Sequence, residues 1–121
     1  MRVRIDGVTI RHIPDADPDA SYLDDAGHAE IESGALSYIG IRAVAETSYA
    51  VGNNGDRRLE QLTSGGLWGV ELWCRDSADP YLAEIAKEEI ADLRAHLEAY
   101  GVRASDAEWR DLTADLEPVY G

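Results

Sequence analysis

The sequence contains a single cysteine, Cys74, and no long apolar run. One cysteine cannot form an intramolecular disulfide, which excludes a bridge-stabilised secreted scaffold and favours a reducing compartment. Residues 1–5 alternate charged and apolar side chains, unlike a signal peptide, and no later stretch is long and apolar enough to cross a bilayer. We therefore expect a cytoplasmic protein that makes no use of a membrane.

Basic residues are scarce, because 24 Asp and Glu stand against 11 Lys and Arg and give a formal net charge of −13. The excess lies in residues 1–37, with eight acids and three bases, and in residues 76–121, with twelve and four. Such a field repels nucleic acid and anionic membranes and attracts basic surfaces. We expect no direct contact with nucleic acid and a basic or nucleic-acid-binding protein as partner. The simpler alternative is that surplus acid only maintains solubility or adapts the protein to a salty cytoplasm.

Nothing in the sequence divides the chain, because it has no linker, internal repeat or low-complexity segment. A chain of 121 residues can bury one core without a metal or a disulfide, so we expect one domain over residues 1–121. Alternating apolar and polar side chains predict its strands, and Asp6-Gly7 favours a two-residue hairpin turn between the first two. The predicted strands form one antiparallel sheet of about five and cover residues 2–5, 8–13, 36–50, 57–63 and 67–74.

Two helices are predicted in the C-terminal third of the chain. Asp79-Pro80 supplies an N-cap and a first-turn proline, apolar residues then recur at helical spacing, and Gly101 provides an end. Ser105 and Glu108 form a capping box for a shorter helix. We expect helices over about 80–100 and 106–116 packed against the sheet, which is an α+β fold. Residues 26–34, which contain two glycines, are predicted to be a connection.

Three blocks of sequence resemble a group of small uncharacterised acidic proteins of phages and mobile elements. They are a Gly-Ile-Arg-Ala strand at residues 40–43, a Thr-Ser-Gly-Gly-Leu-Trp-Gly turn at residues 63–69 and a Tyr-Leu-x-Glu helix start at residues 81–84. The resemblance spans residues 15–102 and departs at residues 72–75, where that pattern runs directly into Ser and Asp. Those proteins have no assigned activity, so the resemblance implies a mobile-element context and not a mechanism.

Motifs for catalysis and cofactor binding are missing. Gly65-Gly66 lack the following helix and the Lys-Ser/Thr ending of a phosphate loop, and we interpret them as a bend that admits Trp68 to the core. Cys74 lies on the apolar side of its predicted strand, which favours a buried, inert thiol. No serine lies in a Gly-x-Ser-x-Gly motif. We predict no catalytic residue and no cofactor, and the sequence leans against an enzyme.

Two parts of the sequence contain some of the residues of a metal-binding motif, and neither motif is complete. Asp15, Asp17 and Asp19 match positions 1, 3 and 5 of a calcium loop, but Ala20 and Ala26 stand where glycine and glutamate are required. A solvated acidic turn is the favoured interpretation, with a weak divalent-ion site as the alternative. Asp92 and His96, one helical turn apart, supply only two ligands, so no metal site is predicted.

The acidic side chains of the longer predicted helix are the one group of residues whose pattern suggests how the protein could bind a partner. Glu84, Glu88 and Asp92 recur every four residues, and like charges at this spacing cost about 0.2–0.5 kcal/mol per pair. Because this row of carboxylates, the acidic row, destabilises the helix, its presence favours a role in binding a basic partner. A solvated helix face is the simpler alternative. Mimicry of DNA phosphates would require either the acidic loop, which we define as residues 15–25, or the acids at residues 106–117 on the same face. The predicted partner-binding residues are Glu84, Glu88, Asp92, Asp15, Asp17 and Asp19.

Three hypotheses for function follow. The leading one is a non-enzymatic acidic interaction protein of a phage or mobile element that binds a basic partner, in its most specific form a DNA-mimic inhibitor of host defence. The second is a small structural or assembly subunit that forms a homo-dimer or larger oligomer through an exposed Trp68, Trp73 or Trp109. The third is a metal-dependent enzyme that uses acids near His96 or His28.

Overall fold

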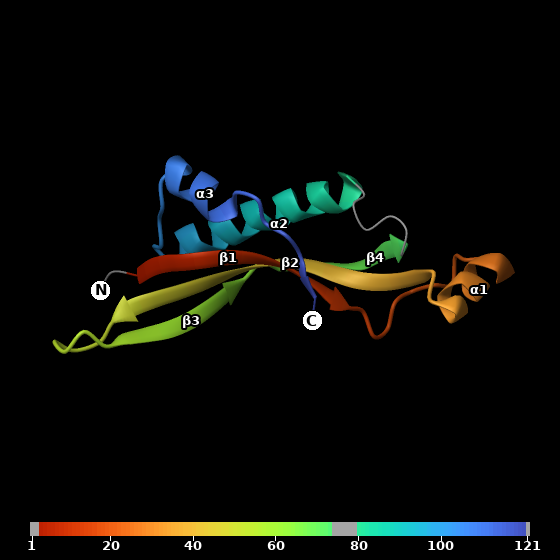
Figure 1. Cartoon of the computed structure of the whole chain (residues 1–121), viewed down its shortest axis with the longest axis horizontal. Helices are drawn as coiled ribbons and strands as arrows, with labels where there is room; N and C mark the ends of the chain where they lie inside the picture. Colours follow the sequence, from red (N-terminus) through yellow and green to blue (C-terminus); the bar gives the residue numbers. More distant parts are fainter. Residues whose placement is uncertain (1–2, 74–79, 121) are drawn as a thin grey trace.

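The computed structural model describes residues 3–73 and 80–120 as an α+β fold with one mixed sheet. The sheet has the strand order β3-β2-β1-β5, and β4 pairs with β2 on the edge that β3 also uses. Helices α2 and α3 cover one face of the sheet, and α1 lies at one end of the molecule (Figure 1). The elements are β1 (Val3–Pro14), α1 (Asp25–Ser33), β2 (Leu36–Ala50), β3 (Arg57–Thr63), β4 (Leu67–Trp73), α2 (Pro80–Ala99), α3 (Asp106–Thr113) and β5 (Val119–Tyr120).

The hairpin predicted at Asp6-Gly7 is wrong, because β1 is one continuous strand that pairs antiparallel with β2 over its whole length. A type I′ turn needs a positive φ at both central residues, and neither Asp6 nor Gly7 has one. The register instead shifts between Ile5 and Gly7, so Asp6 is the extra residue of a β-bulge. The bulge moves the alternation by one position, which keeps Ile5 on the same face as Val8.

The predicted antiparallel sheet is also wrong in one respect, because β5 runs parallel to β1. Five strands are present as predicted, but β1 replaces two of the predicted strands and β5 supplies the fifth. The short C-terminal helix ends at Thr113, before the predicted end at 116. Asp115 then takes a left-handed conformation, with φ of 54°, and the chain turns back onto the edge of β1.

The helices follow their capping signals. The range of α2 agrees with the helix predicted over about 80–100, and Gly101, with φ of 83°, follows its end. The predicted N-cap Asp79 lies outside the described residues. The capping box of α3 is present as predicted, with Ser105 and Glu108 bonding each other's backbone.

A helix was not predicted at α1, and the connection expected over residues 26–34 is therefore wrong. Asp24 caps this helix through the N–H of Gly27, and Gly34, with φ of 82°, ends it. None of its residues is buried. Because the helix buries no apolar stripe, the sequence carries no periodic signal for it.

The strand β2 is buried on both faces. Its predicted core side, with Ile39, Ile41, Ala43 and Ala45, packs in the main core beneath the helices. On the opposite face Tyr38, Gly40 and Val44 are buried as well. The segment after β1 dips to that opposite face before it reaches α1 (Figure 1). The sheet therefore has a second, smaller covered region at the β4 end.

The core contains a buried histidine. His12 of β1 is 2% exposed and packs edge-on against Tyr120 of β5, with 5.4 Å between the ring centroids. Its Nδ1 atom has no hydrogen-bond partner among the described residues. Burial lowers the pKa of His12 below the ordinary value of 6.5, because the charged imidazolium would lose its hydration.

We expect the free energy of unfolding to fall as the pH drops from 7.5 to 5.5. Below pH 6.5 the unfolded chain binds a proton at His12 that the folded chain does not bind, so the unfolded state gains stability. Urea unfolding at several pH values measures this loss. A His12→Phe variant should show a shallower pH dependence over this range, and equal slopes for the two proteins would contradict the assignment.

Candidate functional site

The acidic residues are concentrated on the helices. The three helices carry eleven Asp and Glu against three Lys and Arg, whereas the strands carry five Arg against four acids. The five strand arginines lie on β1, β2 and β3 and are Arg4, Arg11, Arg42, Arg57 and Arg58. The negative field of the protein therefore comes mainly from the helices and loops.

The junction between β3 and β4 is fixed by two acids of α2. Ser64 accepts the N–H of Ala43 through its hydroxyl at 2.9 Å and donates the hydroxyl to Glu89 at 2.7 Å. Glu89 also accepts the N–H of Gly66 at 2.7 Å, and Asp92 accepts the N–H of Gly65 at 2.9 Å. These acids hold a loop to the helix, so Asp92 is a structural residue as well as a candidate for binding.

The predicted acidic row is therefore not uniform. Glu84 is largely exposed and pairs with Lys87, with 3.2 Å between Oε1 and Nζ. Glu88 is exposed. Asp92 is committed to Gly65, and its other oxygen, Oδ1, lies 3.7 Å from Nε2 of His96. Glu84 and Glu88 are the members that face solvent.

The acidic loop also divides into structural and exposed side chains. Asp15 accepts the N–H of Asp17 at 3.1 Å and, through its other oxygen, the N–H of Gly69 at 3.0 Å. Asp19 accepts the hydroxyl of Ser21 at 2.6 Å and its N–H at 3.1 Å, and these bonds hold the pKa of Asp19 below its ordinary value. Asp17 is exposed.

These carboxylates bond separate backbone groups and do not converge. Within residues 3–73 and 80–120, no three His, Cys, Asp or Glu side chains are arranged to hold a metal ion. The hypothesis of a metal-dependent enzyme at His96 or His28 gains no support from these residues.

The two predicted acidic sets approach the same segment of the chain. Asp92 bonds Gly65 and Asp15 bonds Gly69. Four residues of extended chain span at most about 14 Å, so the two contacts lie close together. The helix row and the acidic loop therefore both reach the segment that leads into β4.

Three exposed aromatic rings meet beside β4. Tyr22, Trp68 and Tyr81 are 61%, 49% and 59% exposed, yet they line one pocket with a volume of about 350 Å³. We call this the aromatic pocket, and its remaining lining residues are Leu67, Gly69, Val70 and Glu71. The interpretation of Gly65-Gly66 as a bend that sends Trp68 into the core is wrong, because Trp68 is half exposed.

Gly40 determines where Trp68 lies. A Cβ atom at Gly40 would be 2.3 Å from Cε3, 2.5 Å from Cζ3 and 2.6 Å from Cδ2 of the Trp68 ring. Three atoms of the six-membered ring at nearly equal distances place the face of the ring over the glycine. The sequence contained this signal, because a glycine inside a strand often marks close approach of another group.

A chain of hydroxyl groups holds Tyr22 in place. Tyr22 donates its hydroxyl to Glu71 and lies 2.6 Å from the hydroxyl of Tyr38, which is left as the donor in that pair. The Glu71 carboxylate, followed by Tyr38, raises the pKa of Tyr22 well above its ordinary value. The two hydrogen bonds of Tyr22 link the loop after β1 to β4 and β2.

The other tryptophans differ from Trp68. Trp109 is buried and packs against Arg94, whose guanidinium carbon lies 5.6 Å from the ring centroid. The Trp73 side chain and the whole of Cys74 lie outside the described residues, so the predictions for them stay untested. Trp68 is the only one of the described tryptophan side chains that is available for a contact.

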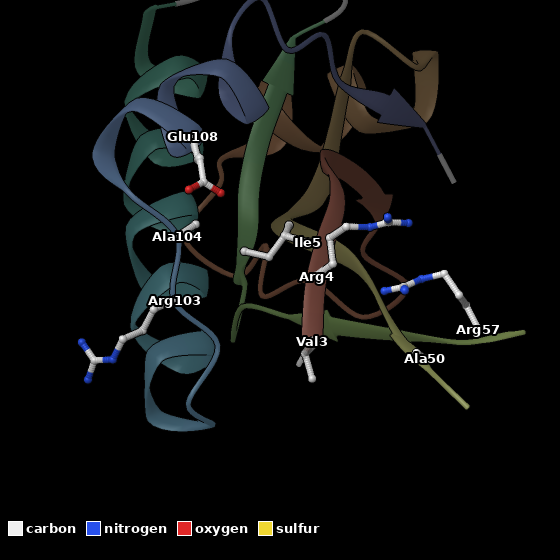
Figure 2. Close-up of a pocket in the computed structure, with 8 residues that line it drawn as sticks. All are labelled: Val3, Arg4, Ile5, Ala50, Arg57, Arg103, Ala104 and Glu108. Atoms are coloured by element: carbon white, nitrogen blue, oxygen red, sulfur yellow. The ribbon is translucent and has the colours of Figure 1, made fainter. Parts of the chain in front are cut away.

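A basic hollow at the opposite end of β2 is less suited to a ligand. Its volume is about 410 Å³, and Arg4, Arg57 and Arg103 line it with Glu108 (Figure 2). Arg4 bonds Asp6 at 2.6 Å, and Arg57 bonds the hydroxyl and the carbonyl oxygen of Ser48, each at 3.1 Å. The guanidinium of Arg103 lies on the other side of the hollow from those of Arg4 and Arg57 (Figure 2). These cations do not converge on one position.

No family model, curated protein or solved structure matches the chain. Among the described residues, no helix is both long enough and apolar enough to cross a membrane.

Replacing Ser64 with alanine should lower the free energy of unfolding by about 1–3 kcal/mol, since the buried N–H of Ala43 and the half-buried Glu89 carboxylate would each lose a hydrogen bond. Urea unfolding measures the change. Ser37→Ala is the matched control, because that hydroxyl is exposed and makes only a 3.4 Å contact, so its cost should stay within about 0.5 kcal/mol. Equal costs would contradict the role of Ser64.

Gly40→Ala should cost about 1–3 kcal/mol and displace Trp68, because the new methyl group would overlap the indole ring. The displacement is measured by the chemical shift of the Trp68 indole N–H. Gly7→Ala is the control on the neighbouring strand, since a Cβ there meets nothing within 4 Å. An unchanged Trp68 signal in Gly40→Ala would show that the ring does not rest on this glycine.

Proposed function

We propose that the protein is a non-enzymatic interaction protein that binds a basic segment of a partner beside β4. The observation that carries the proposal is that the acidic row of α2 and the acidic loop both bond the segment from Gly65 to Gly69. The solvent-facing acids of the two sets are Glu84, Glu88 and Asp17. A basic segment that lies along β4 would meet carboxylates from both sides.

Charge separation supports one orientation of the partner. The helices carry eleven acids against three bases, whereas the strands carry five arginines against four acids, so the strands attract a basic partner far less than the helices do. Complementary charge of this kind sets orientation and the rate of association more than affinity. Among the described residues, β4 pairs only with β2. The side of β4 that faces away from β2 is therefore an edge of the sheet.

A DNA-mimic inhibitor from a phage or mobile element is the most specific form of this proposal. Mimicry depends on spare carboxylates at regular spacing. Asp15 and Asp92 are already engaged by backbone N–H groups, which leaves fewer carboxylates for a phosphate-like pattern. The general form, a basic segment held beside β4, has the stronger support. A homo-dimer through Trp68 uses the same strand and is the second candidate.

The test uses basic proteins retained from host lysate and then purified. The triple variant Glu84→Gln, Glu88→Gln, Asp17→Asn should weaken the binding of such a partner about tenfold, because three exposed charges contribute about 0.5 kcal/mol each. High salt should weaken the parent protein's binding in the same direction. Calorimetric titration measures both effects.

The matched control removes three exposed charges from the C-terminal region with Asp111→Asn, Asp115→Asn and Glu117→Gln. Affinity close to that of the parent is expected. An equal loss in both triple variants would mean that only net charge matters and would overturn the proposed surface. Sedimentation of the protein alone detects the homo-dimer, which would replace a foreign partner if β4 forms its interface.

A further inference from the structure

We infer that the aromatic pocket binds one organic cation, of the class of an arginine guanidinium or a methylated lysine ammonium. The inference rests on the proposed function for the source of that cation, a side chain of the basic partner. It goes further in naming the chemical group and the residues that receive it.

Three aromatic rings line the pocket. Tyr22 comes from the loop after β1, Trp68 from β4 and Tyr81 from the first turn of α2, so three separate elements contribute one aromatic ring each to one pocket. Ring faces attract cations through their quadrupole, and pockets lined by several aromatic rings recognise alkylated ammonium groups. A volume of about 350 Å³ is near the lower limit for small-molecule sites, which suits one side chain.

The Trp68 ring is oriented with one face against the sheet. One face of the ring packs on Gly40, as the three short distances to its six-membered ring show. About half of the side chain is nevertheless exposed. The accessible part is therefore the opposite face, which is the surface that a cation requires. A ring that presented only its edge would repel a cation, because the edge carries partial positive charge.

The described surroundings of the pocket carry negative charge. Glu71 lines the pocket and supplies a carboxylate, and the Tyr22 hydroxyl orients it by donating to Oε1. Asp15 bonds Gly69, another lining residue, and Glu84 lies one helical turn beyond Tyr81. Among the residues that the structure describes, no arginine or lysine lines this pocket. A cation is favoured over an anion or a neutral apolar group.

The pocket is assembled before any ligand binds. The hydroxyl chain from Tyr38 through Tyr22 to Glu71 fixes one wall, and Gly40 fixes the position of Trp68. A ligand therefore loses little affinity to the ordering of side chains. Small free probes are expected to bind with dissociation constants in the millimolar range, so the isolated pocket can be tested without the partner.

The experiment titrates the ¹⁵N-labelled full chain with arginine amide, acetyl-trimethyllysine amide and citrulline amide. Citrulline has the shape of arginine without its charge. The indole N–H signal of Trp68, assigned with Trp68→Phe, should shift saturably with at least one cation, and citrulline should bind at least tenfold more weakly. The Trp109 indole signal reports that the fold is intact, because that ring is buried.

Three variants locate the site. Tyr81→Leu and Glu71→Gln should each weaken the binding of the better cation about fivefold or more. Tyr100→Leu removes an exposed ring at the far end of α2 and should leave the affinity unchanged. Equal binding of arginine and citrulline amides would identify an apolar pocket, and the absence of any saturable shift would leave no ligand site. Either result overturns the inference.

The outcomes separate this inference from the proposed function. The pocket would be supported and the wider surface rejected if the probes bind but the Glu84, Glu88 and Asp17 substitutions leave the affinity for a partner unchanged. Partner binding that depends on those acids but survives Tyr81→Leu and Glu71→Gln would support the surface and reject the pocket.

Discussion

The Ser64 hydroxyl determines how the rest of the structure is arranged. Two strands, β3 and β4, pair with the same edge of β2, and the chain must pass from one to the other at Ala43. Ser64 fills that gap, since its hydroxyl accepts the Ala43 N–H while its own N–H donates to the Ala43 carbonyl oxygen. The same hydroxyl donates to Glu89, which couples the junction to α2. One small side chain therefore joins the edge of the sheet to the helix that covers its core.

That junction positions the candidate site. From Gly66 onward the chain enters β4, where Trp68 folds back over Gly40 of β2 and leaves one ring face outward. The loop after β1 reaches the same strand through Asp15 and Tyr22. The aromatic pocket is thus built from segments distant in sequence, and each is fixed by hydrogen bonds to a neighbour. Its acidic surroundings follow from the same contacts, because carboxylates are the groups that accept the free N–H groups of Gly65, Gly66 and Gly69.

The sequence predicted those parts of the fold that depend on local patterns. Alternation located β2, β3 and β4, and the capping box located α3. It did not locate α1, which buries no residue, or β5, which has only two. Asp6-Gly7 was misread, because a bulge and a hairpin turn favour the same residue types and only the long partner strand decides between them. The acids of the site were named from spacing, whereas Trp68 was assigned to the core, since sequence alone does not show which face of a sheet is covered.

The shared edge of β2 has a consequence for the lengths of the loops. The turn between β2 and β3, residues 51–56, is wholly exposed and could gain or lose residues without moving any buried group. The connection between β3 and β4 has no such freedom, because three consecutive residues, 64–66, each bond a fixed partner. An inserted residue there would slide β4 along β2 and turn its alternate side chains to the wrong face. Variation in loop length should therefore be tolerated before β3, at residues 51–56, and excluded after it, at residues 64–66.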